Sequence, residues 1–371
     1  MAQTIITTSA AQTKKKWAGA LFNSSVPESY WGSHFMKEGS AESAPNAPIH
    51  LITDLEKDSG DEVNFDIYAQ LTGSPTYGDD NLEGNEESLT PYSDKILINQ
   101  VRKATDSGGE MTRKRTTNNH RMICRNKLTD WWSRFFDEAV FMNISGARGS
   151  NADYILPTAS TAAIEGQSLV ARSSGNIIYS GAATSKTSLV SDDKFSLTSI
   201  DKAVTKAETE GGGSDGVIRI TPLRIDGVDK YVCLVHNYQE HDMRTSTTTG
   251  QWLDIQKAAT TNNGTKNPIF TGSLGEYRGV VLHKHNKVTR FKDYGAGNVA
   301  AARAIFMGRQ AMVAAFGSPA NGLRFDWAEE WRDYKNRLGI ATKCIVGLKR
   351  PQFNGNDVNS IVIDSAAAQP Y

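Results

Sequence analysis

The sequence predicts an α+β fold, and three observations support this prediction. Residues 62–71 alternate apolar and polar side chains with the two-residue period of a half-buried strand. Residues 117–145 repeat apolar side chains at spacings of three and four, as in a long helix. The other predicted strands and helices show no regular βαβ alternation and no internal repeat. With 371 residues, 39% of them hydrophobic, the chain is long enough for two or three folded units of about 150 residues each.

The first 50 residues predict an extended arm. They are rich in Ser, Ala, Pro and Gly, and they lack the apolar repeat that a core of their own would need. Large aromatic side chains are nevertheless scattered through them, at Trp17, Phe22, Tyr30, Trp31 and Phe35. Disordered tails are poor in aromatic residues, so we expect the arm to lie across another surface, with a disordered tail as the alternative.

Residues 62–71 begin a predicted β-hairpin with a long connection. The apolar side chains of its first strand are those of alternate residues from Val63 to Leu71. A returning strand is predicted from Lys95 through Lys103, and the connection contains glycines, a proline and many acidic residues. Connections of this length are uncommon in compact domains unless they have a function.

Charge is distributed unevenly around this hairpin. Residues 54–94 contain twelve acidic side chains and a single base, Lys57, whereas residues 95–127 are mainly basic. Opposite patches on one subunit can pair between copies and fix their orientation, although two solvated faces that never meet are the alternative. The predicted contact residues are Asp79, Asp80, Glu83, Glu86 and Glu87 on one side, and Arg113, Lys114 and Arg115 on the other.

The helix predicted over residues 117–145 is the longest in the chain. Gly146 stands where a C-terminal cap belongs, and about 1.5 Å per residue gives a length of roughly 40 Å. Asp137 and Glu138 are expected on its polar side together with Arg121, Arg125, Asp130 and Arg134. Its apolar side is expected to pack along a sheet through the core residues Leu128, Trp131, Trp132, Phe135 and Phe136.

The remaining elements are predicted from shorter patterns, and residues 147–194 have no assignment. Residues 302–316 are small and apolar, and we expect a buried helix or a strand followed by a helix there. Asp226-Gly227 predicts a hairpin turn. Helices are predicted at 196–210 and 251–260, and strands at 217–220, 223–225, 230–236, 279–283, 340–353 and 360–363.

Composition predicts a soluble protein made in a reducing compartment. Lys plus Arg and Asp plus Glu both number 41, so there is no basic excess of the kind that dedicated nucleic-acid-binding proteins use. The cysteines at 124, 233 and 344 are odd in number and lie far apart, which argues against a disulfide framework or a structural zinc site. The sequence has neither a secretory signal pattern nor about 20 consecutive apolar residues that could cross a bilayer.

No catalytic residue, metal site or cofactor is predicted. His283 and His285 lie on one side of a predicted strand but have no third ligand nearby. His236 and His241 do not form the H-E-x-x-H arrangement of metalloproteases. Gly211–Gly213 lack the following GK[ST] of a phosphate-binding loop, so a linker is the simpler interpretation.

Five stretches in order resemble the major capsid proteins of tailed bacteriophages, in the branch found in phages of the N-four type. They lie within residues 50–363, and the first 45 residues are not matched in this way. The stretches are PLRIDGVDKYVCLVH at 222–236, WLDIQKAA at 252–259, NPIFTGSLGEYRGV at 267–280, MGRQAMVAAFG at 307–317 and IVGLK at 345–349.

This resemblance implies the Hong Kong 97 fold and the function of a shell subunit. Hexamers and pentamers would close into an icosahedral head around double-stranded DNA, which the protein would contact weakly, with separate portal, scaffold and possibly decoration proteins. The subunit would be made in the bacterial host cytoplasm and reside in the virion. The implied parts are an N-terminal arm at 1–50, an extended β-hairpin loop at 51–111, a peripheral domain with a spine helix at 112–190, an axial domain at 191–315 and a return to the peripheral domain at 316–371.

Two other functions remain open on the residues alone. One is an intracellular α+β hydrolase whose site forms only in three dimensions, which requires a concave pocket with perturbed titratable groups. The other is a nucleic-acid-binding protein that uses Lys14–Lys16 and Arg113–Arg115, which requires strongly salt-dependent binding to duplex DNA.

Overall fold

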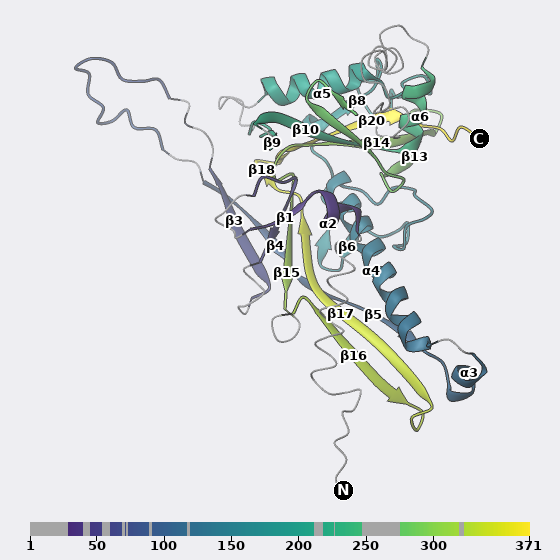
Figure 1. Cartoon of the computed structure of the whole chain (residues 1–371). Coiled ribbons are helices and arrows are strands. Elements are labelled where there is room, and N and C mark those ends of the chain that lie inside the picture. The colour runs from purple at the N-terminus through teal and green to yellow at the C-terminus, as the bar shows by residue number, and fades with distance from the viewer. Residues whose placement is uncertain are drawn as a thin grey trace.

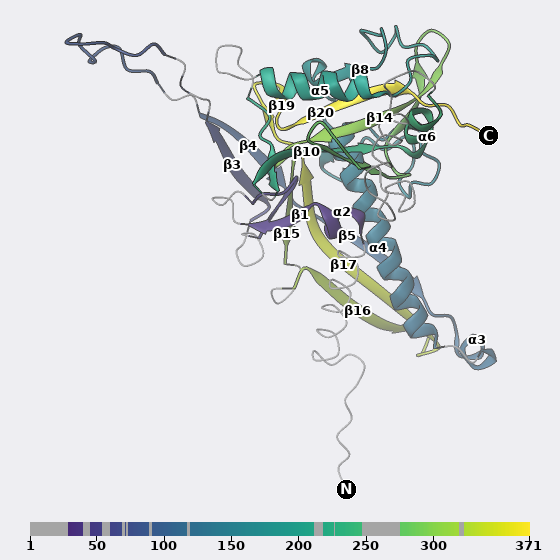
Figure 2. The same ribbon diagram turned by 45° about the horizontal axis from the view of Figure 1, so that its top comes forward.

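The chain forms two β-sheet bodies connected by one long helix, and a hairpin arm reaches away from both (Figure 1). The view in Figure 2 shows the same separation between the arm, the bodies and the lower end of the helix. The computed structural model describes residues 29–39, 45–53, 60–68, 71, 73–88, 91–116, 119–210, 218–225, 227–246, 275–318 and 323–371.

The first body is built on β17 (Arg337–Lys349), and we call its sheet the β17 sheet. Along one edge β17 pairs first with β16 (Phe325–Arg332) and then with β15 (Met312–Gly317). Along the other edge it pairs with β5 (Asn99–Asp106). Even-numbered residues from Leu338 to Val346 are buried, so the strand shows the two-residue period that its sequence predicts. The other strands of this sheet are β1 (Met36–Gly39) and β2 (Ile49–Ile52).

The second body contains the β14 sheet, covered by a helix. The strands, in pairing order, are β11 (Glu276–Tyr277), β12 (Val280–Lys284), β10 (Val228–Val235), β14 (Val299–Met307), β20 (Ser360–Ala366) and β8 (Ile177–Tyr179), with β13 (Arg290–Tyr294) on β14 and β9 (Leu223–Ile225) on β10. The predicted helix at 196–210 is confirmed as α5 (Leu197–Thr209), whose buried Ile200 and Val204 share a core cluster with Phe306 and Ile361.

Short elements complete the chain. The hairpin predicted at Asp226-Gly227 is confirmed by the antiparallel pairing of β9 with β10, and Gly227 has a φ of 79°, which favours glycine. The remaining elements are α2 (Tyr30–His34), α3 (Glu110–Arg115), α6 (Asn237–Thr245), β6 (Ala162–Ile164), β7 (Gln167–Ser168), β18 (Gln352–Phe353), β19 (Asn356–Asp357) and a 3₁₀ turn at Ser174–Asn176.

The predicted long helix is confirmed as α4 (His120–Ser145), which has 26 residues. Its caps follow from the sequence, because the Asn119 side chain accepts the Met122 N–H and Gly146 adopts the left-handed conformation at φ 71°. The expectation that Asp137 and Glu138 face solvent is wrong, since both are buried. From Phe135 to Ser145 α4 packs against both sheets at once, and every residue there except the partly exposed Asn143 is buried.

The hairpin arm consists of β3 (Glu62–Tyr68) and β4 (Pro91–Leu97), paired in register from Glu62 with Leu97. The predicted returning strand at Lys95–Lys103 is wrong in its limits, because the chain leaves the hairpin after Leu97 and enters the β17 sheet as β5. A side chain at Gly347 would lie 2.2 Å from the Leu97 carbonyl oxygen, so glycine permits this close crossing.

Two further predictions are wrong, and two cannot be fully compared with the structure. Residues 302–316 contain β14 and β15 rather than a helix, because fully buried strands lose the polar alternation that identifies a strand. Residues 218–220 of the predicted strand at 217–220 have no regular structure. The helix predicted at 251–260 lies outside the described residues, as do residues 1–28 of the predicted arm, with Trp17 and Phe22.

Candidate functional site

The connection between β3 and β4 is an exposed acidic loop, defined here as residues 73–88. The side chains of Asp79, Asp80 and Glu83 are all exposed. Two other carboxylates hold the loop itself together, since Glu86 accepts the Gly84 N–H at 2.8 Å and Glu87 accepts the Gly73 N–H at 2.6 Å. The loop therefore presents free negative charge at Asp79, Asp80 and Glu83.

The predicted basic partners lie on α3. Lys114 and Arg115 are exposed, whereas the Arg113 guanidinium donates to the carbonyl oxygens of Gly108 and Asn336. Arg113 also lies 5.0 Å from the centre of the Trp331 ring. Lys114 and Arg115 are therefore available to a partner, and Arg113 has a structural role.

The acidic loop and α3 lie at opposite extremes of the folded molecule in both views (Figures 1 and 2). Among the described residues, no ion pair joins the two groups. Their charges can meet only if two copies come together.

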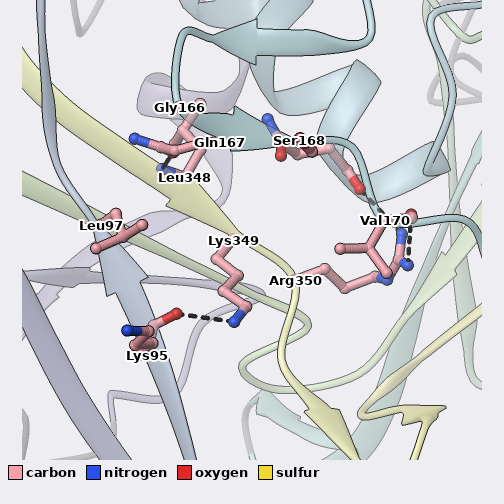
Figure 3. Close-up of a pocket in the computed structure, with 10 residues that line it drawn as sticks. Lys95, Leu97, Gly166, Gln167, Ser168, Val170, Leu348, Lys349 and Arg350 are labelled. Carbon is pink, nitrogen blue, oxygen red and sulfur yellow. Dashed lines mark hydrogen bonds between the residues drawn. The ribbon is translucent and has the colours of Figure 1, made fainter.

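A small pocket lies between β4, the β6–β7 hairpin and the end of β17 (Figure 3). Lys349 forms an ion pair with Asp94 and donates to the Lys95 carbonyl oxygen at 2.8 Å. The Arg350 guanidinium pairs with Asp357 at 2.6 Å. Lys349 and Arg350 therefore both have carboxylate partners in the fold.

The histidines considered as metal ligands pack instead against aromatic rings. His283 lies 5.2 Å from the Phe35 ring and His285 lies 4.5 Å from the Tyr30 ring, measured between centroids. Burial lowers the pKa of both imidazoles, that of His285 to about 4. Within the ranges that the structure describes, no three His, Cys, Asp or Glu side chains gather into a metal-binding group.

Comparison with known proteins identifies the family. The profile of the family described as phage capsid protein matches residues 5–369. The chain belongs to this family.

Individual capsid proteins agree with this assignment. The chain is 27% identical over 336 residues to the major capsid protein of Pseudomonas phage KPP25, covering 83% of this chain and 82% of that one. The capsid of Ralstonia phage GP4 matches with a TM-score of 0.81 and 42% identity over 100% of both chains. The capsid of cyanophage Pam1 matches with a TM-score of 0.73 and 18% identity over 92% of this chain and 93% of that one, which supports the fold.

The predicted fold class is confirmed: this major capsid protein has the α+β Hong Kong 97-like fold. The long helix α4 is called the spine helix from here on. No described helix of the capsid protein is both long and apolar enough to span a membrane.

The predicted core residues of the spine helix lie against the β17 sheet, with one difference. Leu128, Trp132, Phe135 and Phe136 are buried, and the Trp132 indole donates to the Thr342 hydroxyl at 2.7 Å. Trp131 is only partly buried: its ring stacks on Phe135 at 5.2 Å, and the Lys103 amine lies 5.3 Å from its centre.

Three buried arginines that the sequence analysis did not identify hold the C-terminal end of the spine helix. A helix leaves its last four carbonyl groups without intrahelical partners, and the helix dipole favours cations there. Each arginine comes from a different part of the chain, and Arg303 lies on β14 while Arg350 directly follows β17, so together they connect the helix to both sheets. Arg172, Arg303 and Arg350 donate to the carbonyl oxygens of Ile144, Ser145 and Asn143, at 3.2, 2.8 and 3.0 Å respectively.

Two buried aspartates pair with these three arginines. Arg303 forms two hydrogen bonds of 2.8 Å with the Asp364 carboxylate. Asp357 pairs with both Arg172 and Arg350, and these cations outweigh burial and hold its pKa below the ordinary value. The only sequence signal for this cluster is a charge within an apolar run, as at Arg303 in Ala301-Ala-Arg-Ala-Ile305.

Proposed function

We propose that this major capsid protein forms hexamers and pentamers that close into an icosahedral head around double-stranded DNA, with its acidic loop laid over a neighbouring copy. The observation that carries the proposal is the exposed acidic loop, held far from the oppositely charged α3 of its own chain. Charge complementarity of this kind steers association and fixes the relative orientation of the partners. Many modest contacts of this type, repeated over a lattice, add up to a stable shell.

We propose the domain limits implied by the sequence, with the arm at 1–50, the extended loop at 51–111, the peripheral domain at 112–190 and 316–371, and the axial domain at 191–315. The strands β8 and β20 pair within the β14 sheet, so the axial domain also takes these two strands. The strand β5 pairs within the β17 sheet and serves the peripheral domain.

The shell also has partner proteins and a place of synthesis in this proposal. Portal, scaffold and possibly decoration proteins are separate chains, and a formal net charge of zero is compatible with weak contact to packaged DNA. We place synthesis in the bacterial host cytoplasm, assign no enzymatic activity, and retain the branch of the N-four-type phages.

The test reverses charge on the acidic loop. We expect the combined change Asp79→Lys, Asp80→Lys and Glu83→Lys to reduce the yield of shells at least about tenfold, since ~1.4 kcal/mol changes an equilibrium constant tenfold. The melting temperature of the unassembled subunit should stay the same, because none of the three side chains packs in the core. Gradient sedimentation and electron microscopy measure the yield.

A matched control reverses three exposed acids of the body that contains the β14 sheet, with Asp192→Lys, Glu208→Lys and Asp229→Lys. This control makes the same change in net charge, so it separates a local contact from a general electrostatic effect. Equal yields for the two triple variants would contradict the assigned role of the loop.

A further inference from the structure

Two histidines stand side by side where two parallel strands of the β14 sheet end. The last paired residues of β10 and β12 are Val235 and Lys284, so the residues that follow them, His236 and His285, are neighbours. The His285 N–H donates to the Val235 carbonyl oxygen at 3.0 Å, which holds the two strand ends together. His236 is buried and His285 is partly buried, so both imidazoles belong to the packed interior of this body.

Each imidazole fixes the turn that follows its strand, and both do so in the same way. The His236 Nδ1 accepts the N–H of Tyr238, and the His285 Nδ1 accepts the N–H of Lys287, both at 3.1 Å. A ring nitrogen accepts a hydrogen bond only while it carries no proton. Both turns therefore require a neutral histidine.

The turn at His236 begins α6. His236 is the N-cap of this helix, and its own N–H donates to the Gln239 side-chain oxygen at 2.8 Å. The buried Gln239 amide donates in turn to the Ala302 carbonyl oxygen at 3.1 Å and to the Ser365 hydroxyl at 2.8 Å. These two acceptors lie on β14 and β20, so the cap at His236 also orients α6 on the sheet.

The ring of His285 connects α2 to α4. Its centroid lies 4.5 Å from that of the Tyr30 ring on α2 and 5.1 Å from that of the Phe141 ring on α4. The planes of the His285 and Phe141 rings are only 21° apart, as in a stacked pair. Two elements that are distant in sequence thus meet on one titratable side chain.

The environment of the pair opposes protonation of either ring. Burial lowers the pKa of both histidines to about 4, and the nearby cations act in the same direction, Arg290 on His236 and Lys287 on His285. The carboxylate of Asp153 acts in the opposite direction on both rings. A proton on either ring therefore has to be placed in the interior beside an existing positive charge.

The other titratable groups of the packed elements have contacts of their own. They are Tyr30 and His34 of α2, which stack on each other, Asp137 of α4 with the Trp31 N–H, Glu138 of α4 with Lys287, Glu240 of α6 with Lys284, and His283 of β12 with the Phe35 ring.

We propose that His236 and His285 form an acid-sensitive lock that holds α6 and the turn after β12 in place. A proton on Nδ1 turns an accepted hydrogen bond into two opposed N–H groups, and it adds a charge beside Arg290 or Lys287. Histidine protonation of this kind converts a local change of charge into a change of structure. Acid then opens these two segments before the β17 sheet unfolds, because stability is not uniform across a fold. This inference concerns the single subunit and does not depend on the proposed shell function.

Hydrogen exchange of the full-length, unassembled chain between pH 7 and pH 4.5 tests the lock. A histidine whose pKa is about 4 in the closed state and 6.5 in the open state favours opening by roughly tenfold to a hundredfold at the lower pH. We expect the protection of residues 236–246 and 284–290 to fall by this factor, while residues 337–349 of β17 are still protected. Simultaneous exchange of all three regions would indicate global unfolding and overturn the inference.

Asparagine variants remove the titration and retain the acceptor. The Asn side chain accepts the same kind of N–H at a helix N-cap or a turn, and it takes up no proton in this pH range. We expect His236→Asn to keep the protection of residues 236–246 at pH 4.5, and His285→Asn to keep that of residues 284–290. The matched control is His241→Asn, at an exposed histidine of α6, which should lose protection like the unaltered protein.

An NMR titration of the histidine rings in the unaltered protein makes the test independent of the variants. We expect His236 and His285 to stay neutral until α6 loses its protection, and to take up their protons together with that loss. Rings that titrate near pH 6.5 while α6 stays protected would overturn the inference. Asparagine variants that fold normally and open as readily as the unaltered protein would overturn it as well.

Discussion

Replacing Arg303 by Met should strongly destabilise the subunit. The Arg303 side chain is 9% exposed and that of its partner Asp364 is 1% exposed, so the substitution leaves a carboxylate buried without its cation. It also removes the hydrogen bond to the last carbonyl of α4, Ser145, and the bond from Arg303 to the Tyr294 hydroxyl. Breaking a buried ion pair from one side costs about 3–5 kcal/mol, and we expect a loss in that range.

Urea unfolding of the unassembled subunit at pH 7 measures this loss. The matched control is Lys186→Met, which breaks an ion pair with Asp293 whose side chains are 47% and 63% exposed. Exposed pairs contribute at most about 1 kcal/mol, so this control should remain close to the unaltered protein.

A double variant completes the test. Arg303→Met combined with Asp364→Leu removes both charges, and replacing a buried pair by apolar residues is often nearly neutral. The double variant should therefore recover most of the loss. A loss for Arg303→Met no larger than that of Lys186→Met, or a double variant less stable than the single one, would refute the argument that an unpaired buried charge causes the effect.

The remaining predictions concern the spine helix and pH. Trp132→Ala should cost about 3–5 kcal/mol in urea unfolding, the usual value for a large buried aromatic residue, and the partly buried Trp131→Ala should cost clearly less; equal losses would contradict the assigned packing. Burial lowers the pKa of His236 and His285 from 6.5 to about 4, so the unfolded chain binds their protons first and stability should fall as pH decreases from 6.5 to 4. Burial raises the pKa of Asp137 from 3.8 to about 6 and also raises the pKa of Asp242, which favours the folded state on acidification. Burial lowers the pKa of His283 as well, so these two carboxyl groups oppose three histidines. Unfolding free energies that stay constant or rise from pH 7 to pH 4.5 would contradict this balance.

The sequence predicted the elements that have strong local signals. The spine helix has a capping asparagine at Asn119, a glycine at Gly146 and an apolar repeat between them, so its limits were correct within three residues. The first strand of the hairpin could be recognised in the sequence because polar residues alternate with apolar ones along it. Residues 302–316 gave no such signal, because a strand buried on both faces has the composition of a buried helix.

The candidate site was predictable in charge but not in geometry. The acidic and basic runs are evident from composition, yet only the fold shows that they occupy opposite ends of the subunit. Arg113 could not be distinguished from Lys114, because its partners at Gly108 and Asn336 depend on contacts across the chain.

The way in which the hairpin arm is attached has a consequence for lattice geometry. Lys349 and the packing of Ile96 secure the arm at its root, while the arginine cluster fixes the spine helix to both sheets. Five-fold and six-fold rings require different tilts between adjacent subunits. We therefore expect a subunit with such a firmly held centre to accommodate the two curvatures by bending its arm beyond the root, without repacking its interior.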